Sequence, residues 1–277
     1  MPTIKLYPNG MTMGAGGNPN PVGGKRGAVV GWSKSSVRRH TQWLYSVDTT
    51  TLDGSGWSLT LTLRDCPGTA AEWQALRKRY VDSLTASGVV IRCHWVTEWT
   101  RRKVPHLHLA VYLPSGTDKE DVERLLVDTW IQYGAKFGTI RKAQHLAPIY
   151  GALGWMAYLS KHSARGVDHY QRQGTPPGWE KTGRLWGHFG TWGTREPIEG
   201  NLPYAEFFRF RRLARSWRVA DARAAVAAGK ASARRITSAR HMLRHNDSQL
   251  SRLRGISEWI DEDHALRLLS IVDSERA

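Results

Sequence analysis

The sequence contains little cysteine and no long apolar run, and each of these absences excludes a class of protein. Only two cysteines, Cys66 and Cys93, occur among 277 residues, and their spacing fits neither a CxxC pair nor a disulfide framework. Few cysteines are typical of the reducing cytoplasm, which is the expected location. No apolar run is long enough to cross a bilayer, and residues 1–31 lack the apolar segment of a secretory signal. We therefore expect no membrane partner.

A phosphate-binding loop of the ATPase type is also missing. The segment Gly23-Gly24-Lys25-Arg26 resembles part of one. However, the first glycine of the motif would fall on Pro19, and Arg26 stands where serine or threonine is required. The sequence therefore predicts no ATP-driven motor, such as a helicase.

Basic side chains, in contrast, are abundant. Lysine and arginine number 40 against 24 aspartate and glutamate residues, which gives a formal net charge of +16. Such an excess says little about the fold and points to phosphate-rich polymers or anionic membranes as partners. Thirteen tryptophans are many for this length. Most are expected in the core, and some are candidate platforms on which bases stack.

Composition divides the chain into three regions. Residues 1–31 are rich in glycine, proline and asparagine, which predicts a mobile arm. Residues 32–200 contain the strand and helix patterns of a folded domain. Residues 201–277 form a basic, helical C-terminal region, in which arginine recurs from Tyr204 onward. We expect these helices to contact phosphates without sequence preference, and the alternative is an ordinary solvated helical face.

Periodicity in the central region predicts an α+β fold, with a mainly antiparallel central sheet flanked by helices. Strand patterns occupy residues 57–64, 89–99 and 105–113. The five residues between the last two strands are few enough for a hairpin turn, so these strands should pair antiparallel. Helical patterns occupy residues 33–45, 69–88 and 117–134, and a segment that follows Pro148 and runs to about Arg165. Thr69 and Thr117 each begin a capping box.

The stretch from Glu98 to His108 contains the strongest chemical signal. Side chains alternate in the strand at residues 105–113, so His106 and His108 emerge on the face opposite to the leucines. In a tight hairpin, Glu98 lies across from His106, about 5 Å away at Cβ. Two imidazoles and a carboxylate leave positions free for water and phosphate oxygens, which favours Mg²⁺ or Mn²⁺ over a closed zinc site. The alternative is a solvated His-x-His beside a chance glutamate.

A candidate nucleophile lies on the last of the predicted helices. Tyr158 and Lys161 are three residues apart and share a helix face, and Arg165 extends that face by one turn. A tyrosine hydroxyl has a pKa of about 10 and is a weak nucleophile until a cation or metal favours its anion. Lys161 could hold a phosphate or the developing charge, or it could be an ordinary surface lysine. Tyr150 and His162 are rival candidates.

Three motifs, in this order, resemble those of the HUH endonucleases, which are named for two histidines that flank a hydrophobic residue. Leu59-Thr60-Leu61-Thr62-Leu63, followed by Pro67, resembles the first motif of that family. Pro105-His106-Leu107-His108, with Glu98 upstream, resembles its metal-binding motif. Tyr158-Leu159-Ser160-Lys161 resembles its catalytic Tyr-x-x-Lys motif. Within the superfamily, the sequence is similar to the rolling-circle replication initiators of bacterial plasmids and filamentous phages.

The resemblance covers residues 32–165, and Gly183-Arg184-Leu185-Trp186-Gly187 resembles a segment that follows the tyrosine helix in such proteins. Some relatives use a second tyrosine one helical turn from the first. Here position 154 is glycine and position 162 is histidine, which favours an enzyme with a single tyrosine.

The resemblance implies an RRM-like nuclease core and an enzyme that nicks and rejoins single-stranded DNA at a replication origin. Glu98, His106 and His108 would hold a divalent metal, and Tyr158, assisted by Lys161, would form a 5′-phosphotyrosine. The released 3′-hydroxyl would prime a host DNA polymerase, and a separate helicase would open the duplex. The basic residues expected along the DNA path are Arg38, Arg39, Arg101, Arg102, Lys103, Arg165 and Arg184.

Two alternatives share parts of these patterns. Conjugative relaxases and single-strand transposases use the same chemistry but usually arrange the motifs differently along the chain. A non-catalytic RNA-binding module with the same kind of sheet is the alternative from a different class.

Overall fold

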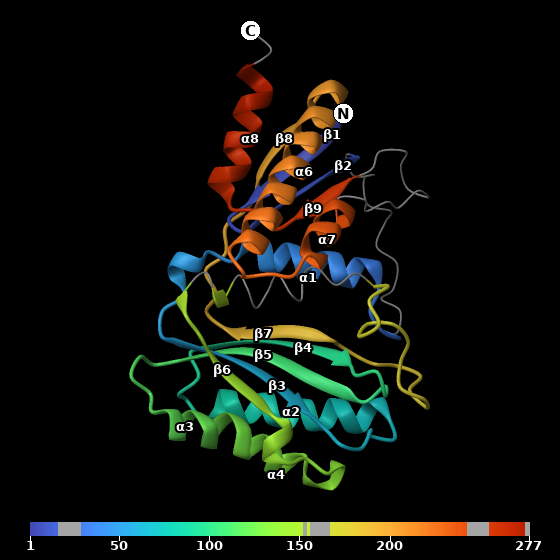
Figure 1. Ribbon diagram of the computed structural model, residues 1–277. Helices are drawn as coiled ribbons and strands as arrows, with labels where there is room; N and C mark the ends of the chain where they lie inside the picture. Colours follow the sequence, from blue (N-terminus) through green and yellow to red (C-terminus); the bar gives the residue numbers. More distant parts are fainter. Residues whose placement is uncertain (16–28, 152–153, 156–166, 243–254, 275–277) are drawn as a thin grey trace. The chain divides into compact units, whose positions relative to one another are not determined.

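The chain forms two compact units (Figure 1). The computed structural model describes residues 1–15, 29–151, 154–155, 167–242 and 255–274. The central unit comprises Lys25–Gln42 and Thr49–Gly193. The terminal unit comprises Met1–Gly24, Trp43–Asp48 and Thr194–Ala277, so both ends of the chain belong to it.

A five-stranded antiparallel sheet forms the centre of the central unit, in the order β6-β3-β5-β4-β7. The strands are β3 (Ser55–Thr62), β4 (Arg92–Trp99), β5 (Pro105–Leu113), β6 (His145–Ile149) and β7 (Trp186–Gly190). β3, β4 and β5 confirm the three predicted strands, and the hairpin between β4 and β5 is confirmed as well. The predicted α+β class is therefore confirmed.

Three helices lie along one face of this sheet (Figure 1). They are α2 (Ala70–Ala86), α3 (Lys119–Glu123) and α4 (Thr129–Tyr133), and a π-helical segment, Arg124–Asp128, joins the last two. Helix α1 (Lys34–Ser46) begins in the central unit, and its last residues belong to the terminal unit. Short 3-10 turns occupy Thr49–Thr51, Ala135–Phe137 and Arg141–Ala143.

Alternation of side chains along the strands decides which face is covered. Leu59 and Leu61 of β3 and Leu107 of β5 are at most 1% exposed and share one core with Trp73 and the other apolar residues of α2. Burial of each such side chain stabilises the fold by about 1.5–3 kcal/mol. The residues between the leucines therefore emerge on the opposite face of the sheet.

One of the two predicted capping boxes is confirmed. Thr69 is the N-cap of α2, and its Oγ1 accepts a hydrogen bond from Glu72 N at 3.2 Å. The other is wrong, because the N-cap of α3 is Asp118. The Thr117 hydroxyl instead donates to the carbonyl oxygen of Pro114 at 2.7 Å, which closes the preceding turn.

The terminal unit contains a four-stranded antiparallel sheet in the order β8-β1-β2-β9. Its strands are β1 (Pro2–Tyr7), β2 (Gly10–Ala15), β8 (Ile198–Asn201) and β9 (Ile256–Glu258), and its helices are α6 (Tyr204–Ala227), α7 (Arg234–Met242) and α8 (Glu262–Ser274). The basic segment after Tyr204 is thus helical, as expected, over Tyr204–Ala227 and Arg234–Met242. None of the helices that the structure describes is long and apolar enough to cross a membrane.

The prediction of a mobile arm at residues 1–31 is wrong for residues 2–15, which form β1 and β2. Ile4 and Leu6 of β1 and Met11 and Met13 of β2 are at most 5% exposed and pack in one core with the two buried phenylalanines of α6, Phe207 and Phe210. The glycine-rich composition concealed this short alternation of apolar residues. Their partner strands, β8 and β9, are separated from them by about 200 residues or more of sequence. No local sequence pattern could therefore indicate the pairing.

Candidate metal centre on the central sheet

The β4–β5 hairpin places three candidate ligands on one face of the sheet. Glu98 of β4 pairs directly with His106 of β5, and His108 lies two residues further along β5 on the same face. The turn between the strands is closed by a hydrogen bond from Thr100 N to the carbonyl oxygen of Val104, at 2.9 Å. Lys103 adopts a left-handed conformation in this turn, with φ of 63°. The short turn fixes a register in which Glu98 lies opposite His106, and this is the register that the sequence predicted.

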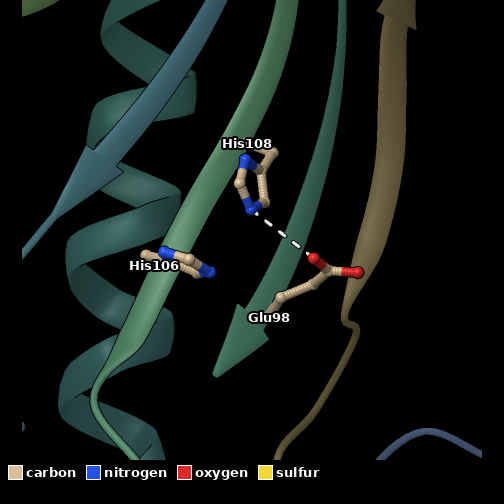
Figure 2. A group of neighbouring side chains, drawn as sticks. All are labelled: Glu98, His106 and His108. Atoms are coloured by element: carbon tan, nitrogen blue, oxygen red, sulfur yellow. Dashed lines mark ion pairs between the residues drawn. The ribbon is translucent and has the colours of Figure 1, made fainter. Parts of the chain in front are cut away.

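The three side chains point toward one another (Figure 2). Their ligand atoms all lie within 4.8 Å of one another, and His108 Nε2 is 3.5 Å from Glu98 Oε2. Glu98 is fully buried, and His106 and His108 are 8% and 4% exposed. Burial of a carboxylate costs free energy unless the carboxylate is paired or binds a metal ion. Glu98 therefore requires a partner at this site.

The donor set fits a divalent metal ion. Thr60 Oγ1 of β3 is 3.1 Å from His108 Nδ1. When the Nδ1 proton is donated to that hydroxyl, the lone pair of Nε2 is left for a metal, which is the usual arrangement of a metal-binding histidine. One carboxylate oxygen and two imidazole nitrogens leave further coordination positions for water or phosphate oxygens, as Mg²⁺ and Mn²⁺ prefer.

Two residues at this site were missed from the sequence. Arg172 Nε donates to Glu98 Oε1 at 3.2 Å, and both side chains are fully buried. Gln171 Nε2 is 3.3 Å from His106 Nε2. The contact between Arg172 and Glu98 spans 74 residues of sequence, and the segment that holds Arg172 has no strand or helix periodicity. No local signal could therefore have revealed it.

The predicted catalytic pair, Tyr158 and Lys161, lies outside the residues that the structure describes, as do Arg165 and the rival His162. The other rival, Tyr150, is described and is 79% exposed. It follows Ile149, which pairs with Gly56, four residues along β3 from Thr60. At about 3.3 Å per strand residue, Ile149 lies about 13 Å from the point where β3 contacts His108, and Tyr150 follows one residue beyond it. This placement disfavours Tyr150 as the nucleophile.

The basic residues predicted to contact DNA lie at several places around the central sheet. Arg101 and Arg102 are exposed in the β4–β5 turn, close in sequence to Glu98, and Lys103 Nζ donates to the carbonyl oxygen of Gln173 at 2.7 Å. Arg38 and Arg39 are exposed on α1, and Arg184 is exposed before β7. Burial, together with the charge of Arg184, lowers the pKa of the α2 residue Arg77 to about 10.

A hollow opens at the turn end of the central sheet. Its lining residues are Thr62, Leu63, Arg64, Thr100, Arg102, Gly138, Ile140 and Ala143. Thr62 pairs with His106 across β3 and β5, so the hollow lies at the same end of the sheet as the candidate ligands. A hydrogen bond from Arg64, with a smaller effect of the Arg102 charge, lowers the pKa of Asp65 beside it. Two basic residues, Arg64 and Arg102, line the hollow.

The chain resembles replication proteins of a bacterium and of a phage. Residues 56–163 match the family described as Replication-associated protein ORF2/G2P. A protein of Xylella fastidiosa (strain 9a5c) named as a replication protein is 43% identical, over 94% of this chain and 92% of its own. The replication-associated protein G2P of Pseudomonas phage Pf3 is 39% identical, over 99% of this chain and 98% of its own. No solved structure matches the chain.

Proposed function

The chain belongs to the replication-associated protein ORF2/G2P family, and from this premise we propose that it is a rolling-circle replication initiator that nicks and rejoins single-stranded DNA. One observation carries the proposal: a buried carboxylate and two histidines converge on adjacent strands, with their ligand atoms within 4.8 Å of one another. In a basic protein of this family, such a site is suited to a phosphodiester substrate. The expected location is the cytoplasm.

The metal ligands are Glu98, His106 and His108. When bound there, Mg²⁺ or Mn²⁺ supplies Lewis-acid polarisation of the scissile phosphate. Glu98 contributes the one negative charge among the three ligands, and Thr60 orients His108 through Nδ1. The sheet holds all three side chains on neighbouring positions of two paired strands, so little reorganisation is needed when a phosphate approaches.

Tyr158 is the proposed nucleophile. Its Oη attacks the phosphorus, a 5′-phosphotyrosine bond forms, and the bond from phosphorus to the 3′-oxygen breaks. The tyrosine loses its proton, and the leaving 3′-oxygen gains one. Lys161 stabilises the negative charge that develops on the phosphate. Because one phosphate ester replaces another, the step needs no ATP, and attack by a 3′-hydroxyl on the phosphotyrosine rejoins the strand.

The partners follow from the products of this reaction. The free 3′-hydroxyl is a primer for a host DNA polymerase, and a separate helicase opens the duplex. Arg38, Arg39, Arg101, Arg102, Lys103, Arg165 and Arg184 would contact the phosphates of the single strand around the nick. Contacts of this kind are electrostatic, so binding should weaken as salt concentration rises.

The test uses the full-length protein, a single-stranded oligonucleotide from the origin, Mn²⁺ and a denaturing gel. The wild type should give a covalent protein–DNA conjugate that resists SDS, and Tyr158→Phe should give none while it still binds the oligonucleotide. Tyr150→Phe is the matched control and should form the conjugate at the wild-type rate. A conjugate that persists in Tyr158→Phe but disappears in Tyr150→Phe would assign the nucleophile to Tyr150.

The same experiment separates the alternatives. A non-catalytic RNA-binding module would give no conjugate with any oligonucleotide. A relaxase or a transposase would prefer a transfer origin or a transposon end to a replication origin. The family relationship favours the replication origin, because the relatives are named for replication.

A further inference from the structure

We propose that Arg172 is a positioning residue that restricts Glu98 to one-oxygen coordination of the metal. This inference rests on the metal-dependent function proposed above. It concerns how the ligand is held, because Arg172 contacts Oε1 of Glu98, whereas His108 lies beside Oε2.

The two oxygens of Glu98 have different neighbours. Oε1 accepts a hydrogen bond from Arg172 Nε at 3.2 Å, whereas Oε2 is 3.5 Å from His108 Nε2. Because the side chains of Glu98 and Arg172 are both fully buried, water cannot replace either partner. One oxygen is therefore held by the guanidinium group, and the other faces the histidines, where a metal would bind.

Arg172 is itself held on two sides. Its guanidinium carbon lies 4.2 Å from the centroid of the Trp32 ring, and Trp32 Nε1 donates to the carbonyl oxygen of Thr97 at 3.1 Å. The neighbouring residue, Gln171, accepts a hydrogen bond from Trp99 N at 2.8 Å through its carbonyl oxygen. Thr97 and Trp99 are the residues on either side of Glu98 in β4, so the arginine is anchored to the strand that carries its partner.

Both the charge and the shape of Arg172 bear on metal binding, and they act in opposite directions. A positive charge near the site repels a divalent cation. The planar guanidinium group, stacked on an indole, fixes the direction of its Nε–H bond, which a flexible ammonium group does not do. If Arg172 acts by position, replacing it by lysine should weaken metal binding even though the charge is kept. If it acts only by charge, replacement by glutamine should tighten metal binding.

The test measures Mn²⁺ affinity of the full-length protein by electron paramagnetic resonance of free Mn²⁺, with the water-proton relaxivity of bound Mn²⁺ as a second readout. Arg172→Gln should bind Mn²⁺ about 10- to 100-fold more weakly, as loss of an outer partner typically does, and Arg172→Lys should also bind more weakly. Relaxivity should fall in both variants, because a released carboxylate can chelate with both oxygens and displace water.

Arg92→Gln is the matched control. Arg92 is also a buried arginine of β4, with its Nε donating to the carbonyl oxygen of Thr191 at 2.8 Å and an ion pair to Asp53, but it lies six residues from Glu98. Arg92→Gln should change the Mn²⁺ affinity by no more than about twofold relative to the wild type. Thermal unfolding of every variant identifies those that fail to fold, and Arg172→Lys keeps the test decisive if Arg172→Gln is among them.

The outcomes separate this inference from the proposed function. If the wild type binds no Mn²⁺, or if Glu98→Gln binds it equally well, the metal site itself is wrong. If Glu98→Gln loses Mn²⁺ while both Arg172 variants bind it as tightly as the wild type or more tightly, only the positioning role of Arg172 is overturned. Unchanged relaxivity in weakened Arg172 variants would likewise exclude the one-oxygen restriction.

Discussion

Glu98 lies directly opposite His106 across the β4–β5 pair, at the end of the sheet where the hairpin turns. Neighbours in such a pair are about 5 Å apart at Cβ, and here one residue supplies a carboxylate and the other an imidazole. The five-residue turn fixes this register, and a slip by one residue would move His106 and His108 to the leucine face. The candidate metal centre is therefore a consequence of strand register.

Removal of the carboxylate should abolish the stabilisation that a metal provides. In the wild type, Mn²⁺ at about 100 times its dissociation constant should stabilise the folded state by about 2.7 kcal/mol and raise Tm by about 5–10 °C. Glu98→Gln should show no such rise, and its metal-free Tm should be lower because Arg172 loses its buried partner, at a cost of about 3 kcal/mol. Differential scanning calorimetry with and without Mn²⁺ measures both effects.

Glu72→Gln is the control for that experiment, since Glu72 is a glutamate of the same unit that pairs with Lys136 at the surface. Its response to Mn²⁺ should equal that of the wild type. A full Mn²⁺ response in Glu98→Gln would show that the ion binds elsewhere.

The β4–β5 turn should contribute to the salt dependence of DNA binding. Arg101 and Arg102 are exposed at the end of the sheet that carries the ligands, and each phosphate contact to a single strand contributes about 0.7 to the slope of log K against log salt. The double variant Arg101→Ala and Arg102→Ala should therefore reduce that slope by about 1.4. Fluorescence anisotropy with a labelled oligonucleotide at several salt concentrations measures it.

Arg124→Ala is the matched control for the turn arginines. Arg124 is exposed and pairs with Asp121, and it begins the π-helical segment between α3 and α4, on the helix-covered face of the sheet. Its removal should leave the slope unchanged. If the loss of slope per removed charge were equal in the two variants, net charge, and not the turn, would govern binding.

Local patterns in the sequence were sufficient for the central strands and for the three candidate ligands. β5 alternates without interruption, and a short turn leaves only one register with β4, so the positions of Glu98, His106 and His108 relative to one another were predictable. β6 and β7 were not predicted. β6 includes Pro148, which is tolerated because β6 is an edge strand and the missing N–H faces away from β3.

Contacts between distant segments could not be predicted in this way. Arg172 reaches Glu98 from a segment without periodicity, and its role depends on Trp32, which lies in a third part of the chain. The N-terminal strands depend on β8 and β9. In each case the free energy that stabilises the contact comes from burial and pairing, which exist only after the chain has folded.

The N-terminal strands should be essential for the stability of the terminal unit. Met11 is fully buried in its core, and truncation of such a side chain to alanine costs about 2–5 kcal/mol. Met11→Ala should therefore lower the free energy of unfolding by that amount, measured by urea denaturation with circular dichroism. Met1→Ala is the control, because Met1 is 74% exposed, and it should have no effect. A mobile arm would make the two variants indistinguishable.

The terminal unit should also lose stability as the pH rises, because of Glu258. Glu258 is fully buried in β9, with Arg218 Nη1 3.2 Å from its Oε1. Burial raises the pKa of Glu258 above its ordinary value of 4.5, and the charge of Arg218 only partly offsets this. The folded state therefore holds the proton more tightly than the unfolded state does. The resulting stabilisation is complete below pH 4.5 and is lost as the pH rises through the pKa of the folded state.

Glu258→Gln keeps the side chain neutral at every pH and so removes this dependence. The free energy of unfolding of the wild type, minus that of Glu258→Gln, should decrease as the pH rises above 4.5. Urea denaturation of both proteins at intervals of pH measures this difference. Glu199→Gln serves as the control, since Glu199 is an exposed partner of Lys5 on the same sheet, and its difference from the wild type should not show that decrease. If the difference for Glu258→Gln increased with pH, the ion pair with Arg218 would outweigh burial, and the direction assigned to the pKa of Glu258 would be wrong.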